Sequence, residues 1–264
     1  MPLTFDVDAV VLDIEGTTSA TGFVVDVLYP YSRSRFGALL AERSEDPEVR
    51  RAVAQARELL GEPGADSVRI EKALNEWLDG DVKATPLKTL QGLIWAEGFA
   101  RGDLVSHFYD DVLPVLRRWH GDGVRLHVYS SGSVAAQRAW FASSPEGDLL
   151  PLVDGLYDTE NAGPKQEPES YRRIAAATGT EAGRLLFLSD RPGELDAARA
   201  AGWHAVGIRR PGEPYYEQGV GDHAQAGTFD EIGISSTGTR ARTGAGTGTR
   251  TSTSTSTSTS GSTA

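Results

Sequence analysis

The chain has 264 residues, of which 39% are hydrophobic and 24% charged, the proportions of an ordinary soluble globular protein. It contains no cysteine, which excludes disulfides, cysteine-ligated zinc, iron–sulfur clusters and thiol catalysis. The formal net charge of −11 disfavours nucleic acids and anionic membranes as partners, because both prefer basic surfaces.

Short apolar runs alternate along the chain with stretches of helical periodicity. The expected strands are residues 9–13, 124–129, 155–157, 185–189 and 205–208. The helices expected around and between them are residues 107–120, 133–142, 169–178 and 194–201. Because strand and helix alternate, we predict an α/β fold with a Rossmann-like parallel sheet and helices on both faces.

The long segment between the first two expected strands is different. It has helical periodicity at residues 47–60, 67–78 and 87–99 and almost no strand signal. A connection of this length inside a compact sheet should form a structure of its own. We therefore predict an all-helical cap at residues 24–105, inserted after the first strand, and a catalytic core formed by residues 1–23 and 106–234.

Residues 235–264 are mainly Ser, Thr and Gly, and none of them is an apolar residue larger than alanine. Such a segment cannot bury enough surface to offset the entropy that it would lose on ordering. We expect a disordered tail.

No apolar run approaches the ~18 residues that span a bilayer, and no basic segment followed by an apolar one opens the chain. We expect a cytoplasmic protein.

Ligands bind at the carboxyl ends of the strands in open parallel sheets. Four successive expected strands are followed by groups that have a use in phosphoryl transfer. In chain order these groups are Asp13 and Glu15, Ser130 and Ser131, Lys165, and Asp190 and Glu194.

Each group has a chemical task that suits its type. Asp13 can attack phosphorus and form an aspartyl-phosphate, and Glu15 can pass a proton to the leaving oxygen. The hydroxyls of Ser130 and Ser131, with backbone N–H groups at the start of the next helix, can cradle an anion. Lys165 supplies a positive charge for the phosphoryl oxygens.

The same residue types indicate which metal the site would bind. With no cysteine and no histidine pair at ligand spacing, carboxylate oxygens must hold any metal, which favours Mg²⁺. Asp13 and Asp190 would share it.

Taken singly, an aspartate at a strand end is usually a capping residue, and a lysine beside a proline is usually solvated. If each residue had only such a structural role, we would not expect four successive strands to be followed by groups that all suit phosphoryl transfer.

This order of groups resembles the haloacid-dehalogenase superfamily, whose pattern DIEGT, SSGS, Lys165 and SDRPGE match. The wider chain resembles one of its families more closely, the enolase-phosphatases (acireductone synthases) of methionine salvage. The stretches that carry this resemblance are DIEGTTS with FVVDVLYPYSRSRF, LQGLIWAEGFARGDL, YDDVLP, VYSSGSVAAQRAWF and KQEPESYRRIA, which together extend over most of residues 8–208.

The resemblance implies an enzyme that enolises 2,3-diketo-5-methylthiopentyl 1-phosphate and then removes its phosphate to give the acireductone. It implies that Asp13 is the nucleophile and, with Glu15 and Asp190, a Mg²⁺ ligand. Glu15 would bind through its backbone carbonyl, which leaves its side chain for acid–base work. The remaining roles are phosphate binding by Ser130, Ser131 and Lys165, and support of the metal ligands by Glu194.

Several alternatives stay open at this point. The chain is similar enough to the superfamily to be another capped phosphomonoester phosphatase, a dehalogenase or a non-catalytic phosphate-accepting module. In the cap, Trp95, Phe99 and Leu104 either contact the methylthio end of the substrate or form the helical core. No interface stripe stands out in the sequence, so we expect a monomer.

Overall fold

The computed structural model describes residues 2–80, 82 and 84–235. Its centre is a six-stranded sheet in which all neighbouring strands are parallel, in the order β4-β3-β2-β5-β6-β7. The strands are β2 (Ala9–Leu12), β3 (Arg125–Tyr129), β4 (Gly155–Tyr157), β5 (Leu185–Ser189), β6 (His204–Ile208) and β7 (Ala224–Ala226). The predicted parallel sheet is confirmed, and of its six strands only β7 had no counterpart among the expected strands.

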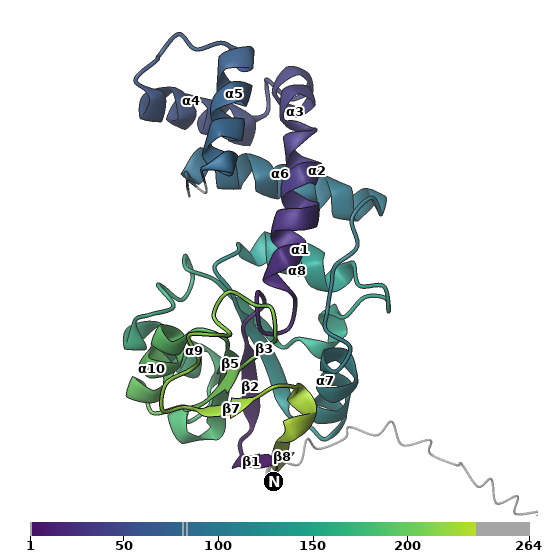
Figure 1. Ribbon diagram of the computed structural model, residues 1–264, viewed down its shortest axis with the longest axis vertical. Helices are drawn as coiled ribbons and strands as arrows, with labels where there is room; N and C mark the ends of the chain where they lie inside the picture. Colours follow the sequence, from purple (N-terminus) through teal and green to yellow (C-terminus); the bar gives the residue numbers. More distant parts are fainter. Residues whose placement is uncertain (1, 81, 83, 236–264) are drawn as a thin grey trace, which may run out of the picture.

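Helices cover both faces of this sheet, as the sequence predicts. They are α7 (Val112–Gly121), α8 (Val134–Ala142), α9 (Pro168–Thr178) and α10 (Pro192–Ala200). In Figure 1, α9 and α10 lie on one side of the sheet and α7 on the other. Short 3₁₀ turns lie at η2 (Leu150–Leu152), η3 (Ala182–Arg184) and η4 (Phe229–Glu231).

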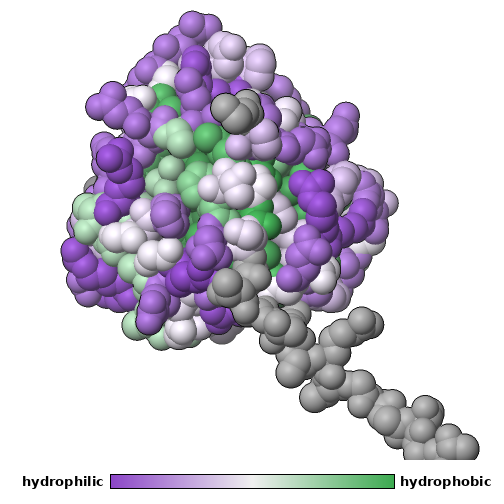
Figure 2. Space-filling model, turned by 90° about the horizontal axis from the view of Figure 1, so that it is seen from below, coloured by the Kyte–Doolittle hydropathy of each residue, from purple (hydrophilic) through white to green (hydrophobic). Residues whose placement is uncertain are grey.

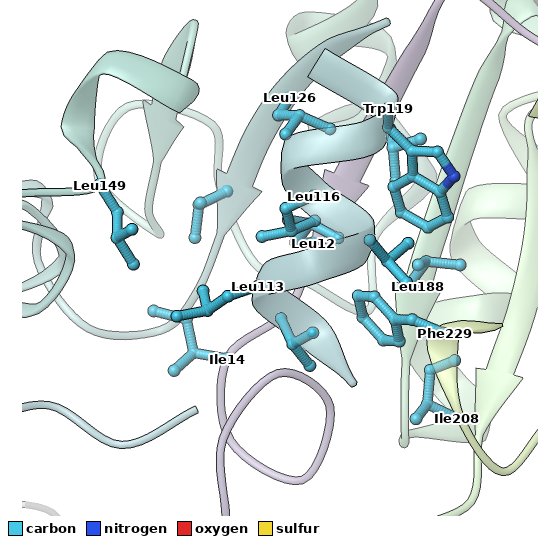
Figure 3. Close-up of a cluster of buried hydrophobic side chains, with 14 of the residues drawn as sticks. Leu12, Ile14, Leu113, Leu116, Trp119, Leu126, Leu149, Leu188, Ile208 and Phe229 are labelled. Carbon is cyan, nitrogen blue, oxygen red and sulfur yellow. The ribbon is translucent and has the colours of Figure 1, made fainter. Parts of the chain in front are cut away.

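The central strand β2 is buried on both faces because its four apolar residues alternate between two hydrophobic clusters. Val10 and Leu12 pack with α7 residues in one cluster, and Ala9 and Val11 pack with α9 and α10 residues in the other. Figure 3 shows the first cluster, in which Leu116 of α7 lies against Leu12. This packing holds the end of β2 and the start of the turn after it in a fixed position.

A second, two-stranded parallel sheet lies at the lower end of the molecule in Figure 1. It pairs β1 (Leu3–Asp6) with β8 (Ile232–Ser235). Figure 2 shows the molecule from below, with apolar surface gathered in the middle and polar residues around it. Ser235, expected to begin the tail, is the last residue of β8, and residues 236–264 of the predicted tail lie outside the described residues.

A group of helices rises from the sheet on the side opposite β1 and β8 (Figure 1). It comprises α1 (Thr21–Phe23), the π-helical turn η1 (Val24–Leu28), α2 (Tyr29–Arg33), α3 (Phe36–Glu42), α4 (Pro47–Leu60), α5 (Ser67–Asp79) and α6 (Thr85–Arg101). None of the helices in the described ranges is both long enough and apolar enough to cross a bilayer.

Local sequence signals explain where the cap helices begin and end. The side chain of Asp46 accepts backbone N–H bonds at the start of α4, and Asp66 does the same for α5. Gly61 ends α4 and Gly102 ends α6, both in the left-handed conformation that glycine adopts most easily. A hydrophobic cluster that includes buried residues of α3, α4, α5 and α6 holds these helices together.

The helix expected at residues 107–120 begins later than predicted, at Val112. The segment before it is a connection from the cap to the sheet, and the Tyr109 N–H donates to the carbonyl of Thr18 at 3.1 Å instead of joining a helix. Helical periodicity extends across this segment, but a contact with a distant part of the chain determines its conformation.

Candidate active site

Asp13 follows β2 directly and lies at the carboxyl edge of the sheet, near its middle. Its backbone N–H donates to the carbonyl of Leu188 on β5 at 3.0 Å, and the residue is only 2% exposed. The hydroxyl of Thr17 lies 3.4 Å from Asp13 Oδ2, and that of Thr18 donates to the Asp13 carbonyl at 3.0 Å. The strand and the turn after it therefore hold this carboxylate in one orientation.

The turn after Asp13 requires glycine at position 16. Gly16 has a φ of 75°, and a Cβ built there would lie 2.2 Å from Asp190 Oδ2. A side chain at this position would push the two loops apart, so glycine lets the turn after β2 pack directly against the carboxylate that follows β5.

Lys165 brings a positive charge to Asp13. Its Nζ lies 2.5 Å from Asp13 Oδ1 and 2.7 Å from Glu194 Oε2, and the side chain is 8% exposed. Burial by itself would lower the pKa of Lys165, but the carboxylates of Asp13 and Glu194 outweigh it and raise this pKa above its usual value. The lysine therefore stays charged inside the protein.

Two tyrosines fix the loop that carries Lys165. The hydroxyl of Tyr171 donates to the carbonyl of Lys165 at 2.8 Å, and that of Tyr129 donates to the carbonyl of Gly163 at 2.7 Å. Both rings are buried between the sheet and α9. The backbone on both sides of the lysine is thus tied to the core, which aims a long, flexible side chain at one place.

Glu194 was expected to support the metal ligands, and the structure shows that its contacts are with Lys165 and Ser189. The Ser189 hydroxyl lies 2.9 Å from Glu194 Oε2 and 3.5 Å from Asp13 Oδ2. Burial raises the pKa of the Glu194 carboxyl, and the charge of Lys165 opposes that effect. Glu194 and Asp13 thus flank the ammonium group, with Ser189 between the two carboxylates.

Asp190 is a buried carboxylate with an unused oxygen. Its Oδ1 accepts no hydrogen bond from any described residue, although the residue is only 4% exposed. Burial, and then the charge of Asp13, raise the pKa of Asp190 to about 8. A buried acceptor without a partner is costly, so this oxygen is suited to bind a ligand.

The remaining candidates lie at the ends of β2 and β3. The Ser130 hydroxyl lies 3.4 Å from Glu15 Oε2 and accepts the Gly132 N–H at 3.1 Å. Ser131 is exposed on the same loop. Burial, and then the charge of Asp13, raise the pKa of the Glu15 carboxyl, which favours a form that holds a proton. Glu15 is thus close to Ser130 at the edge of the same site.

Asp158 is a structural residue of this edge that the sequence analysis did not single out. It follows β4 and is buried, and its Oδ2 accepts the Val134 N–H at the start of α8 at 2.9 Å. The rule that identified Asp13, a polar residue directly after a strand, would have found it. Asp158 fixes the start of the helix behind Ser130 and Ser131.

The described residues contain no group of three or more His, Asp or Glu side chains placed to hold a metal ion. The oxygen donors around Asp13 include its own carboxylate, the carboxylate of Asp190, whose Oδ1 has no hydrogen-bond partner among the described residues, and backbone carbonyls, whereas the Glu194 carboxylate is already paired with Lys165. A hard ion such as Mg²⁺ accepts this type of donor and keeps several waters of its own.

Comparison with protein families and sequences gives consistent results. The model for haloacid dehalogenase-like hydrolases matches residues 7–202. "Enolase-phosphatase E1" of Streptomyces avermitilis is 84% identical over 235 residues, which cover 89% of this chain and 98% of that protein. The protein of the same name from Frankia alni is 53% identical over 225 residues, covering 85% of this chain and 94% of its own length.

Solved structures share the fold. The UTR4 protein of Saccharomyces cerevisiae superposes with a TM-score of 0.70 at 31% identity, covering 85% of this chain and 99% of that one. A haloacid dehalogenase-like phosphatase from Thermococcus onnurineus has a TM-score of 0.55 at 19% identity, covering 85% of this chain and 95% of its own. The second likeness concerns the fold alone.

Proposed function

Because this chain belongs to the haloacid dehalogenase-like hydrolases and, within them, to the enolase-phosphatase E1 family, we propose that it converts 2,3-diketo-5-methylthiopentyl 1-phosphate to the acireductone. It is a phosphatase of methionine salvage, and the proposal names its substrate and the residues that act on it. The observation that carries the assignment of residues is the 2.5 Å contact between the Lys165 ammonium and the Asp13 carboxylate at the end of the central strand.

Asp13 is the nucleophile in this proposal. One of its oxygens attacks phosphorus, the bond from phosphorus to the substrate oxygen breaks, and water then hydrolyses the aspartyl-phosphate. The fixed orientation of Asp13, with Thr17 and Ser189 near its Oδ2, supports this role because a nucleophile works best when it is already aligned.

The phosphate is bound by Ser130, Ser131 and Lys165. Lys165 is already held between Asp13 and Glu194, so it stands where the phosphoryl oxygens would arrive during attack by Asp13. A charged lysine offsets the negative charge that two carboxylates and a phosphate would otherwise bring together.

Glu15 handles protons. Its pKa is raised by burial and by Asp13, so a protonated Glu15 can give its proton to the leaving oxygen. In the enolisation, which comes first, the carbon that bears the phosphate lies next to a carbonyl, and its proton is therefore acidic. An ionised Glu15 that takes this proton becomes the protonated form that later gives it to the leaving oxygen. A glutamate reaches one methylene further than an aspartate would, which suits a residue that serves two proton transfers.

The residues present fit a divalent ion, and we assign Mg²⁺ to the carboxylates of Asp13 and Asp190 and the backbone carbonyl of Glu15. The fit rests on the unpartnered, buried Asp190 Oδ1 beside a second carboxylate, a pair that a cation would stabilise. When bound, Mg²⁺ offsets the charge between nucleophile and phosphate and stabilises an enolate oxygen.

We also propose that residues 24–105 act as a cap over a core formed by residues 1–23 and 106–234. Of the cap residues considered for the methylthio group, Phe99 and Leu104 are buried in the main hydrophobic cluster, and Trp95 Nε1 donates to the Leu28 carbonyl at 2.9 Å. These contacts support a packing role for all three. A cytoplasmic monomer remains our expectation.

The direct test is to incubate the protein with the diketone phosphate and Mg²⁺. We expect ultraviolet absorbance of the enol and the acireductone, with release of phosphate. Phosphate release from other phosphomonoesters without reaction on this substrate would instead make the protein a different capped phosphatase. Activity that survives removal of divalent ions by a chelator would contradict the metal assignment and favour a dehalogenase.

A further inference from the structure

The chain passes between the sheet and the cap helices twice, and both crossings contact the same loop. The first crossing leads from Ser19 into α1, and the second runs from Leu104 to Asp111. The loop in question, residues 209–217, follows β6, so it is distant in sequence from both. We call it the clamp loop.

Glu213 is the residue of the clamp loop that contacts both crossings. Its Oε1 and Oε2 accept the backbone N–H of Thr21 at 3.1 and 3.2 Å, at the first residue of α1. Its Oε1 also accepts the hydroxyl of Tyr109, in the second crossing, at 2.5 Å. Glu213 is 9% exposed, so these bonds are largely shielded from water.

Its neighbour Arg210 ties the clamp loop to the catalytic edge of the sheet. The buried Arg210 guanidinium donates to the carbonyl of Thr17 at 3.2 and 3.3 Å and to the carboxylate of Asp111 at 2.7 and 2.9 Å. It also stacks on the Tyr109 ring, 4.3 Å from its centre. Thr17 lies in the turn after Asp13, so one loop joins that turn to both crossings.

We propose that Glu213 is a positioning residue that holds the two crossings together and thereby sets how the cap sits over Asp13. This inference rests on the proposed function, because the cap is assumed to close on the phosphorylated substrate. Glu213 touches neither Asp13 nor Lys165 in the described contacts, so its effect passes through Thr21 and Tyr109.

An acceptor side chain is needed here for a physical reason. The first N–H groups of a helix have no partner within the helix, and the residue before α1, Ala20, has no side chain that can accept them. Glu213 supplies that acceptor, although it is 192 residues away in the sequence. Without it, the Thr21 N–H and the Tyr109 hydroxyl lose their shared partner. The crossings then keep only their direct contacts, in which the Ala20 N–H donates to His107 Nδ1 at 3.2 Å and the Tyr109 N–H to the Thr18 carbonyl at 3.1 Å, and they are held together less firmly.

The test compares four variants of the full-length enzyme: Glu213→Ala, Glu213→Gln, Tyr109→Phe and the control Glu217→Ala. Glu217 is an exposed carboxylate of the same loop. The measurements are kcat and KM for the diketone phosphate and hydrogen exchange of the backbone at residues 20–23 and 104–110.

We expect Glu213→Ala to raise KM roughly tenfold, because the closed cap becomes less populated, with kcat changed by less than about threefold. Glu213→Gln keeps an acceptor oxygen and should stay within about threefold of the wild-type KM. Tyr109→Phe should fall between them, and Glu217→Ala should match the wild type. Exchange at both crossings should be fastest in Glu213→Ala, intermediate in Tyr109→Phe and unchanged in Glu217→Ala.

A Glu213→Ala enzyme with the wild-type KM and wild-type exchange would overturn the proposal, as would a Glu213→Gln enzyme no better than Glu213→Ala. If Glu213→Ala does not fold, Tyr109→Phe decides, and an unchanged KM and exchange there also overturns it. If the wild-type protein releases no phosphate from this substrate, the proposed function fails, and the exchange data alone decide whether Glu213 joins the crossings.

Discussion

The sheet and the cap use charged residues in opposite ways. At the carboxyl edge of the sheet, Lys165, Asp13 and Glu194 pair while their side chains are 8%, 3% and 6% exposed. In the cap, the pair of Arg69 and Glu62 has side chains that are 31% and 45% exposed. Burying charges is costly, so proteins retain such groups where chemistry needs them. The cap instead depends on apolar packing, and its ion pairs contribute little.

The largest effect is expected when Asp13, the proposed nucleophile in the buried group of Asp13, Lys165 and Glu194, is replaced. Asp13→Asn should reduce kcat by at least roughly 10³-fold, because an amide is a poor nucleophile, while Lys165 keeps Glu194 as a partner and the protein folds. Steady-state kinetics measures the loss of kcat, and circular dichroism tests whether the variant folds. Asp122→Asn, an exposed aspartate, is the matched control, and normal turnover by Asp13→Asn would remove Asp13 as nucleophile.

Removal of the buried cation should be nearly as severe. Lys165→Ala leaves Asp13 and Glu194 buried without their shared partner, so we expect roughly 10²-fold or more loss of kcat/KM together with lower thermal stability. Lys72→Ala, a change at an exposed cap lysine, should alter neither. If both variants behave alike, the contrast between buried and exposed charges is wrong.

In the cap, an apolar change should matter more than a charged one. Leu74 of α5 is fully buried in the cap cluster, so Leu74→Ala should lower the free energy of unfolding by about 2–5 kcal/mol. Leu59→Ala, at an exposed position of α4, should change it by less than about 0.5 kcal/mol. Denaturant titration of both variants measures the difference, and equal values would show that the cluster does not hold the cap together.

A buried histidine in the sheet should make stability depend on pH. Burial lowers the pKa of His127, on β3, from 6.5 to about 4. The unfolded chain therefore binds more protons between these pH values, so this contribution to stability is complete above pH ~6.5 and is lost as pH falls towards ~4. The full loss is on the order of 3 kcal/mol. His127→Leu should flatten the pH dependence of unfolding in this window, whereas His204→Leu, at an exposed histidine, should not.

The smallest effect is expected for the exposed pairs of the cap. Arg69→Ala removes the 2.9 Å contact with Glu62, and we expect less than about 1 kcal/mol of destabilisation, reduced further at high salt. Urea titration at low and high salt tests this. A loss as large as that of Leu74→Ala would mean that the cap, too, relies on its charges.

The same contrast explains what could be predicted from the sequence. The strands of the sheet and the groups after them were predictable because β2 and β5 are fully buried, almost entirely apolar runs that polar residues follow directly. Helices α4 and α5 were predictable because their caps and periodicity are local. Strand β1 was missed because it is four half-exposed residues that only pair with β8, at the far end of the described chain.

The residues that join the two parts could not be predicted in this way. Glu213 and Arg210 lie in a loop without periodicity, and their partners Thr21, Tyr109 and Thr17 are about a hundred or more residues away. The late start of α7 has the same cause, since Thr18 takes the N–H of Tyr109. Such contacts depend on the assembled fold and leave no local pattern in the sequence.

The measurement that tests the central claim most directly is to stop the reaction with acid during turnover of the diketone phosphate and to locate the bound phosphoryl group by peptide mass spectrometry. The account predicts one phosphoryl group on Asp13 in the wild-type protein and none in Asp13→Asn. A phosphoryl group on another residue, or turnover without any covalent phosphopeptide, would contradict it.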